Sequence, residues 1–99
     1  MCDKYNKKIL DYKDENLFII FYSLSCGFCV NAINTLKENK LSFKGYDIDK
    51  IKGGLGKLLY CLNQNKNETN FNESHTTKPI IFYKGKFIGG FTDLQSFLK

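Results

Sequence analysis

The sequence predicts an α/β fold: a four-stranded mixed sheet, with two strands parallel and two antiparallel, flanked by helices. Residues 17–22 are an unbroken apolar and aromatic run, which is typical of a strand buried on both faces. Helix-like and strand-like patterns alternate after it, and a strand–helix–strand order implies a parallel pair with a right-handed crossover. Residues 80–90 read IIFYKGKFIGG, in which two apolar runs around Lys84-Gly85 predict a hairpin of antiparallel strands.

The first predicted element is a short helix ahead of the buried strand. Tyr5, Ile9 and Tyr12 recur at positions i, i+4 and i+7, the spacing of one helix face. The polar residues 14–16 end this pattern. After the buried strand, residues 23–25 are small or polar at two of three positions and predict a loop.

A helix and a second strand follow this loop. Val30, Ile33 and Leu36 recur at helical spacing and predict a helix over residues 27–39. Residues 41–48 read LSFKGYDI, and their alternation of apolar and polar side chains predicts a strand.

Two further helices complete the predicted order. Residues 50–54 form a turn, and an apolar stripe then predicts a helix over 54–65. The stripe consists of Leu55, Leu58, Leu59 and Leu62. Residues 65–78 are polar and rich in asparagine, which indicates a long loop or a helix extension with a mobile tail. Thr92 is a good N-cap for a last helix. Its inward-facing residues are expected to be Leu94, Phe97 and Leu98.

Length, composition and charge narrow the class of protein. The 99 residues fit a single domain, 1–99, with enough apolar residues (42%) for a core. The net charge is +5, and all 15 basic residues are scattered lysines, so we expect no nucleic-acid partner and a modest attraction for anionic small molecules. No apolar run approaches the roughly 18 residues of a membrane span. Charges occupy the first residues, where a signal peptide is apolar, which predicts a cytoplasmic, reducing location with four free thiols.

The pair Cys26-x-x-Cys29 allows three kinds of chemistry, of which two fit poorly. A zinc site needs four ligands, and only the distant Cys61 and His75 could complete one, so we expect no metal. A structural disulfide between Cys26 and Cys29 would close a very small loop and stabilise little. It would also be disfavoured in a reducing compartment.

The third chemistry, thiol–disulfide exchange, has a direct physical basis. Cys26 falls where a buried strand gives way to a helix, and the free N–H groups and dipole of a helix start stabilise a thiolate. Cys29 lies one turn further along the same face, where it would be shielded and would react second. A C-x-x-C at such a junction is the expected site of a thiol–disulfide exchanger.

The other two cysteines receive no catalytic role from the sequence. Cys61 is off the predicted leucine stripe and is interpreted as a thiol on the flank of its helix. Cys2 is interpreted as an exposed thiol.

Three motifs, in the same order, resemble those of the thioredoxin-fold superfamily and most closely those of glutaredoxins. They are Cys26-Gly27-Phe28-Cys29, Thr77-Lys78-Pro79 and Gly89-Gly90-Phe91-Thr92-Asp93. The resemblance covers residues 17–98 and implies a thioredoxin-like fold. It also implies a monomer that uses glutathione as co-substrate, requires no cofactor, and reduces protein–glutathione mixed disulfides and protein disulfides.

The resemblance assigns roles to the first two motifs. Cys26 would be the nucleophile and Cys29 the resolving thiol, with Phe28 beside the sulfur where the family often has tyrosine. Pro79 would follow a cis peptide bond and face the cysteines. Thr77 would be among the glutathione-binding residues, and the backbone of Lys78 would contact the cysteinyl part of glutathione.

The third motif would hold the glutamyl end of glutathione. Gly90, Thr92 and Asp93 are the residues that the resemblance places there, assisted by N–H groups at the helix start. Simpler interpretations stay open: the glycines can mark a bend after a strand, and Asp93 can be a carboxylate favoured by the helix dipole.

The sequence departs from the family pattern at positions that bear on glutathione binding. Ser23 stands where the family usually has a lysine or arginine for the glycyl carboxylate. His75 or Lys78 could supply that positive charge, although His75 can also be an exposed loop residue. Gly27 and Phe28 match the monothiol branch, whose dimers hold a [2Fe–2S] cluster. A cluster carrier using Cys26 and a thioredoxin-like reductant independent of glutathione therefore stay as alternatives.

Overall fold

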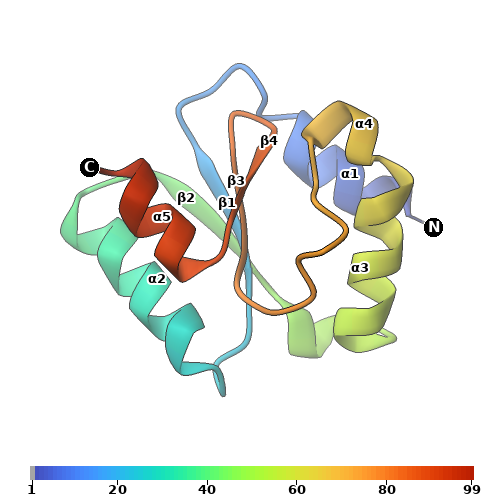
Figure 1. Ribbon diagram of the computed structural model, residues 1–99, viewed down its shortest axis with the longest axis horizontal. Coiled ribbons are helices and arrows are strands. Elements are labelled where there is room, and N and C mark those ends of the chain that lie inside the picture. The colour runs from blue at the N-terminus through green and yellow to red at the C-terminus, as the bar shows by residue number, and fades with distance from the viewer. Residues whose placement is uncertain (1) are drawn as a thin grey trace.

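The computed structural model describes residues 2–99 and shows one four-stranded sheet between two layers of helices (Figure 1). The strands are β1 (Phe18–Tyr22), β2 (Phe43–Asp47), β3 (Ile80–Tyr83) and β4 (Lys86–Gly89). The helices are α1 (Asp3–Leu10), α2 (Gly27–Glu38), α3 (Gly54–Gln64), α4 (Lys66–Thr69) and α5 (Phe91–Phe97), with a 3-10 turn η1 (Ile48–Lys50). Helices α2 and α5 lie on one face of the sheet, and α1 and α3 lie on the other.

The sheet has the strand order β2-β1-β3-β4. Strand β1 pairs in parallel with β2, and the pairs β1–β3 and β3–β4 are antiparallel. The predicted mixed sheet, with its parallel pair and its C-terminal hairpin, is confirmed. Because β1 and β2 run in the same direction, the loops that follow them meet at one edge of the sheet.

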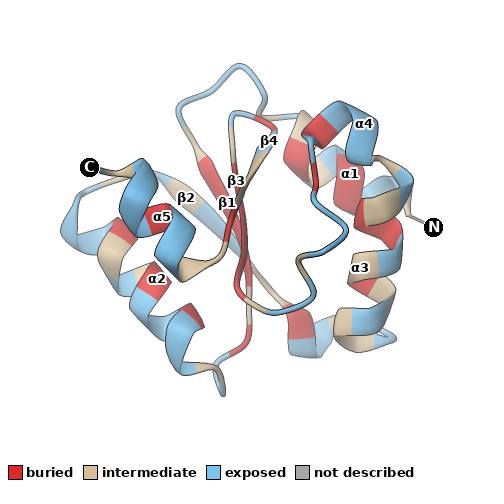
Figure 2. Cartoon of the chain, in the orientation of Figure 1, coloured by how far each residue is buried: buried red, intermediate tan, exposed pale blue. Residues whose placement is uncertain are grey.

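The two central strands supply the core on both faces (Figure 2). Side chains alternate along a strand, so Ile19 and Phe21 face α1 and α3, whereas Phe18 and Ile20 face α2 and α5. All four are at most 3% exposed. This double burial explains why β1 is an unbroken apolar run.

The last helix begins earlier than the sequence predicts. Gly90, not Thr92, is the N-cap of α5, because the Gly90 N–H donates to the Asp93 carboxylate at 2.9 Å and closes the first turn there. Leu94 is buried as expected, but Phe97 is 48% exposed, although its ring makes T-shaped contacts with Phe18 and Tyr83.

Other boundaries shift by a few residues. Strand β2 is shorter than expected because Ile48 already begins η1, and the asparagine-rich segment opens with α4 before it becomes a loop. No helix within residues 2–99 combines the length and apolar character needed to cross a membrane.

The prediction of four free thiols is wrong for two of them. Cys2 and Cys61 form a disulfide that joins the start of α1 to α3, with their Cα atoms 4.9 Å apart. Cys61 is fully buried beside Leu58 and Leu62, in the core cluster on the α1–α3 face. It lies three residues after Leu58, so it belongs to the inward stripe of α3 rather than to its flank.

Candidate active site

The Cys26–Cys29 pair lies at the edge of the sheet where β1 ends. Cys26 has an extended backbone (φ −106°, ψ 114°) and is the N-cap of α2. Its Sγ accepts a hydrogen bond from the backbone N–H of Cys29 at 3.2 Å. A helix start thus directs an N–H group at the Cys26 sulfur, as the sequence predicts.

The two thiols differ in accessibility. Cys26 is partly exposed and Cys29 is fully buried. Burial, and then a hydrogen bond with the Cys26 side chain, raise the pKa of Cys29 from its ordinary 9.0 to about 12. Cys29 is therefore a protonated thiol at neutral pH, behind the sulfur that solvent and substrate can reach.

The second motif lies against the first. The Lys78–Pro79 peptide is cis, as the resemblance implied, and Pro79 is buried. The Cys26 Sγ lies 3.7 Å from the carbonyl oxygen of Lys78, to which the thiol donates. This contact joins residues that are 52 positions apart and places the loop before β3 over the reactive sulfur.

The third motif turns the chain from β4 into α5. Gly89 has φ +137°, and a Cβ there would collide with the Asp93 carboxylate, so only glycine fits this turn. A Cβ on Gly90 would lie 3.3 Å from His75 Cε1, which shows how closely the loop approaches the start of α5. The glycines thus serve both a bend and a close approach.

A hollow of about 210 Å³ lies where the three motifs meet. Its lining residues are Phe28, His75, Thr77, Lys78, Pro79, Gly90, Phe91, Thr92 and Asp93. The structure therefore brings together all eight residues that the resemblance associates with glutathione. It adds Phe91, whose ring lies 6.2 Å from that of Phe28. Phe91 stands inside the quoted motif, where its aromatic character was the available signal.

His75 is part of this hollow rather than a free loop residue. Its Nε2 lies 3.2 Å from the carbonyl oxygen of Pro79, and its ring packs against Phe87 at 5.2 Å between centroids. A carbonyl only accepts, so this hydrogen bond requires Nε2 to carry the hydrogen. Nδ1 then donates to an anion only in the protonated imidazolium.

Ser23 does not face the hollow. Its side chain is fully buried, and its Oγ donates to the Asp49 carboxylate at 2.7 Å. Asp49 is not among the residues predicted from the sequence, although Ser23 and Asp49 follow two neighbouring parallel strands and therefore meet at the same edge. Among the lining residues, Lys78 and His75 are the groups that can carry positive charge.

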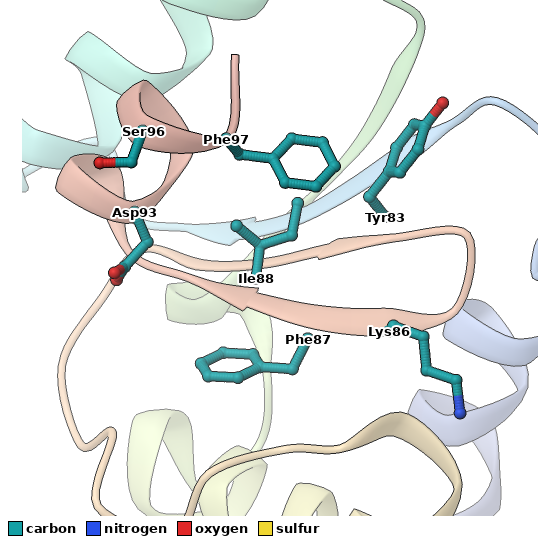
Figure 3. Close-up of a pocket in the computed structure, with 7 residues that line it drawn as sticks. All are labelled: Tyr83, Lys86, Phe87, Ile88, Asp93, Ser96 and Phe97. Atoms are coloured by element: carbon teal, nitrogen blue, oxygen red, sulfur yellow. The ribbon is translucent and has the colours of Figure 1, made fainter. Parts of the chain in front are cut away.

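A larger hollow of about 430 Å³ lies beside this one, between α5 and the β3–β4 hairpin (Figure 3). Its lining is formed by Tyr83, Lys86, Phe87, Ile88, Asp93, Ser96 and Phe97. It shares only Asp93 with the smaller hollow. Neither lining includes Cys26 or Cys29, but the smaller hollow is lined by Lys78, whose carbonyl oxygen lies 3.7 Å from the Cys26 sulfur, so the smaller hollow is the candidate site. Within residues 2–99, no three histidine, cysteine or acidic side chains gather as metal ligands.

Comparison with known proteins settles the family. A family model described as Glutaredoxin matches residues 18–88. The chain belongs to the glutaredoxin family. It is 49% identical over 85 residues to a probable glutaredoxin of Acanthamoeba polyphaga mimivirus, covering 86% of this chain and 80% of that protein. Against four other curated glutaredoxins, it spans 44% to 66% of their length.

Solved glutaredoxin structures share the fold. The dithiolic glutaredoxin of Trypanosoma brucei brucei superposes with a TM-score of 0.70 at 27% identity, covering 92% of this chain and 81% of that one. A buckwheat glutaredoxin solved as a glutathione complex gives 0.69 at 19% identity, covering 96% and 79%. The thioredoxin-like fold is confirmed, and this glutaredoxin is a thiol–disulfide oxidoreductase whose C-x-x-C pair is Cys26 and Cys29.

Proposed function

We propose that this glutaredoxin uses glutathione to reduce protein–glutathione mixed disulfides and protein disulfides through Cys26 and Cys29. The observation that carries the proposal is the hollow beside Cys26, lined by residues of all three motifs. Turnover consumes reduced glutathione, so we also propose that the protein acts in a reducing compartment such as the cytoplasm.

The first step is an exchange at Cys26. Its thiolate attacks the glutathione sulfur of a mixed disulfide, a new Cys26–glutathione disulfide forms, and the substrate protein leaves as a thiolate that takes up a proton. The Cys29 N–H donates a hydrogen bond to the Cys26 sulfur at 3.2 Å, so a backbone donor faces the attacking atom. The partial exposure of Cys26 leaves room for the incoming disulfide.

The second step removes glutathione from Cys26. A glutathione thiolate attacks the glutathione sulfur, which yields oxidised glutathione and restores the Cys26 thiolate. Alternatively, Cys29 attacks the Cys26 sulfur and closes an internal disulfide. That route first requires Cys29, whose pKa is about 12, to lose its proton, so free glutathione is the favoured reductant for mixed disulfides.

The hollow offers complementary charges for a bound glutathionyl group. Asp93 presents a carboxylate for the glutamyl amine, while Lys78 and the protonated form of His75 suit its carboxylates. The buckwheat glutaredoxin of the same fold is described as a glutathione complex. This relationship and the charges support glutathione as the co-substrate.

The test is the release of glutathione from a glutathionylated peptide and, separately, the reduction of a protein with an internal disulfide. We expect the unmodified protein to turn over both substrates with glutathione. Cys29→Ser should keep the first reaction, which needs only Cys26, and lose most of the second. No turnover of either substrate by the unmodified protein, or equal loss of both in Cys29→Ser, would reject the proposed mechanism.

A further inference from the structure

We propose that the Cys2–Cys61 disulfide is a second thiol–disulfide site, at which glutathione adds to Cys2 and Cys61 resolves the adduct. The two sulfurs are not equivalent. Cys2 is partly exposed, whereas Cys61 is 0% exposed. An attacking thiolate must approach a sulfur in line with the bond that it breaks, so access selects Cys2 as the atom attacked.

The surroundings of the two sulfurs suit Cys2 as the atom that is attacked and Cys61 as the resolving thiol. Cys2 is the N-cap of α1, and its carbonyl accepts from the Tyr5 N–H at 3.2 Å, so the helix start is formed beside it. The Cys2 side chain makes no cap hydrogen bond, which leaves its sulfur to the disulfide. Cys61 lies in the core cluster with Leu58 and Leu62, where only an intramolecular partner can reach it.

The chemistry balances with glutathione alone. A glutathione thiolate attacks Cys2 Sγ, the Cys2–Cys61 bond breaks, and Cys61 leaves as a thiolate that takes up a proton. In the reverse step the Cys61 thiolate attacks Cys2 Sγ and releases glutathione. Starting from two thiols, one oxidised glutathione closes the disulfide and becomes two reduced glutathiones.

Opening the bond need not unfold the protein. Tyr5 and Ile9 of α1 are 4% and 0% exposed in the same cluster as Cys61, so apolar packing still holds α1 on α3. Cys61 then remains close to Cys2 and resolves the adduct as an intramolecular partner, which is the condition for fast resolution.

The active-site pair belongs to a different part of the molecule. Helix α2 lies on the opposite face of the sheet from α1 and α3 (Figure 1). A second copy of the protein, through its Cys26, would therefore be the catalyst that removes glutathione from Cys2. The removal of glutathione by Cys26 of a second copy rests on the proposed function, whereas the addition of glutathione to Cys2 does not.

The experiment uses Cys26→Ser/Cys29→Ser, in which Cys2 and Cys61 are the remaining cysteines. Oxidised and reduced glutathione are mixed at defined ratios, free thiols are trapped, and adducts are assigned by peptide mass. We expect reduced glutathione to open the disulfide and the adduct to appear on Cys2. A disulfide that stays closed in excess reduced glutathione under native conditions would overturn the proposal, and this arm needs no substitution in the core.

Two matched variants in the Cys26→Ser/Cys29→Ser background test whether Cys2 and Cys61 have different roles. With Cys61→Ala we expect the Cys2 thiolate to attack oxidised glutathione, to keep one glutathionyl group and to release one reduced glutathione, and this adduct should accumulate because the resolving thiol is gone. With Cys2→Ala we expect labelling of Cys61 to be at least tenfold slower. Equal labelling rates in two folded variants would overturn the assignment of roles.

A catalytic amount of the unmodified protein, added to the Cys2–glutathione adduct, distinguishes the proposed function of Cys26 from the proposed second site at Cys2. Rapid release of glutathione supports the link to Cys26. If the protein fails on every glutathionylated substrate while Cys2 is still labelled selectively, the proposed function fails and the second site stands.

Discussion

The Cys26–Cys29 and Cys2–Cys61 pairs each combine a partly exposed sulfur at a helix N-cap with a fully buried one. They differ in how the chain brings the sulfurs together. Cys26 and Cys29 lie within one turn of α2, whereas Cys2 and Cys61 are 59 positions apart and join two helices. Because each pair has one partly exposed and one buried sulfur, both pairs can undergo thiol–disulfide exchange. The difference in spacing distinguishes a catalytic pair within one helix turn from a crosslink between two helices.

The surroundings of the exposed sulfur decide what each pair can do. Cys26 lies against the Lys78 carbonyl and beside a hollow lined by three motifs, so a substrate can be held while its disulfide reacts. Cys2 begins a helix whose Tyr5 and Ile9 face the core cluster that contains its own partner. We therefore expect that a helix start beside a cysteine does not suffice for turnover, which also requires a place for the substrate.

The largest expected difference is in turnover. Cys26→Ser should reduce glutathione release from a glutathionylated peptide to the uncatalysed rate, because a hydroxyl cannot replace the thiolate. Cys2→Ala should retain turnover, since Cys2 lies on a different helix from the hollow. If Cys2→Ala lost activity as completely as Cys26→Ser, while circular dichroism showed both proteins folded, the assignment of turnover to the Cys26–Cys29 pair alone would be wrong.

The second largest expected difference is in stability, and here Cys2→Ala should have a larger effect than Cys26→Ser. The Cys2–Cys61 disulfide closes a loop of 59 residues. A crosslink of that span lowers the entropy of the unfolded chain and contributes about 4 kcal/mol to the free energy of unfolding in the chain-entropy model. Urea denaturation of Cys2→Ala should show most of that loss.

Cys26→Ser is the control for this measurement. A partly exposed side chain outside the core should change the free energy of unfolding by within about 0.5 kcal/mol. A similar loss in both variants would mean that the loop closure is not the source of the stability.

A pH titration distinguishes the buried members of the two pairs. The folded state raises the pKa of Cys29 from 9.0 to about 12, so the neutral thiol stabilises the fold fully below pH 9 and loses this contribution as pH rises toward 12. Cys61 does not titrate while it is in the disulfide. Between pH 9 and 11 the unmodified protein should lose more stability than Cys29→Ala, and iodoacetamide at pH 9 should label Cys26 but not Cys29. Rapid labelling of both thiols at pH 9 would contradict the shielded position of Cys29.

The sequence predicts the parts of this molecule that depend on local pattern. The apolar run of β1, the helix after Cys26 and the hairpin at Lys84-Gly85 all follow from periodicity and turn chemistry, and the structure has them. Eight of the nine residues lining the hollow were predicted from the family resemblance, and the structure brings them together. Their roles in binding stay predictions.

The features that the sequence did not predict depend on contacts between distant segments. Cys61 was misplaced because the stripe of α3 was read from leucines alone, and its pairing with Cys2 requires α1 to pack on α3. The hydrogen bond from Ser23 to Asp49 requires β1 and β2 to be neighbours. The start of α5 depended on the Asp93 carboxylate reaching back to Gly90, which outweighs the capping propensity of Thr92.

The smallest predicted effect concerns position 23 and would sharpen the argument about the surroundings of Cys26. Family resemblance suggests that Ser23→Lys should tighten glutathione binding by adding a positive charge. The buried Ser23 Oγ, however, donates to Asp49 at 2.7 Å, so the new ammonium would pair with that carboxylate first. We therefore expect Ser23→Lys alone to leave the KM for glutathione within about twofold, and Ser23→Lys/Asp49→Asn to lower it several-fold, with Asp49→Asn as the control. An equal decrease in the single and double variants would show that Asp49 does not hold the lysine, and that the hollow reaches position 23 after all.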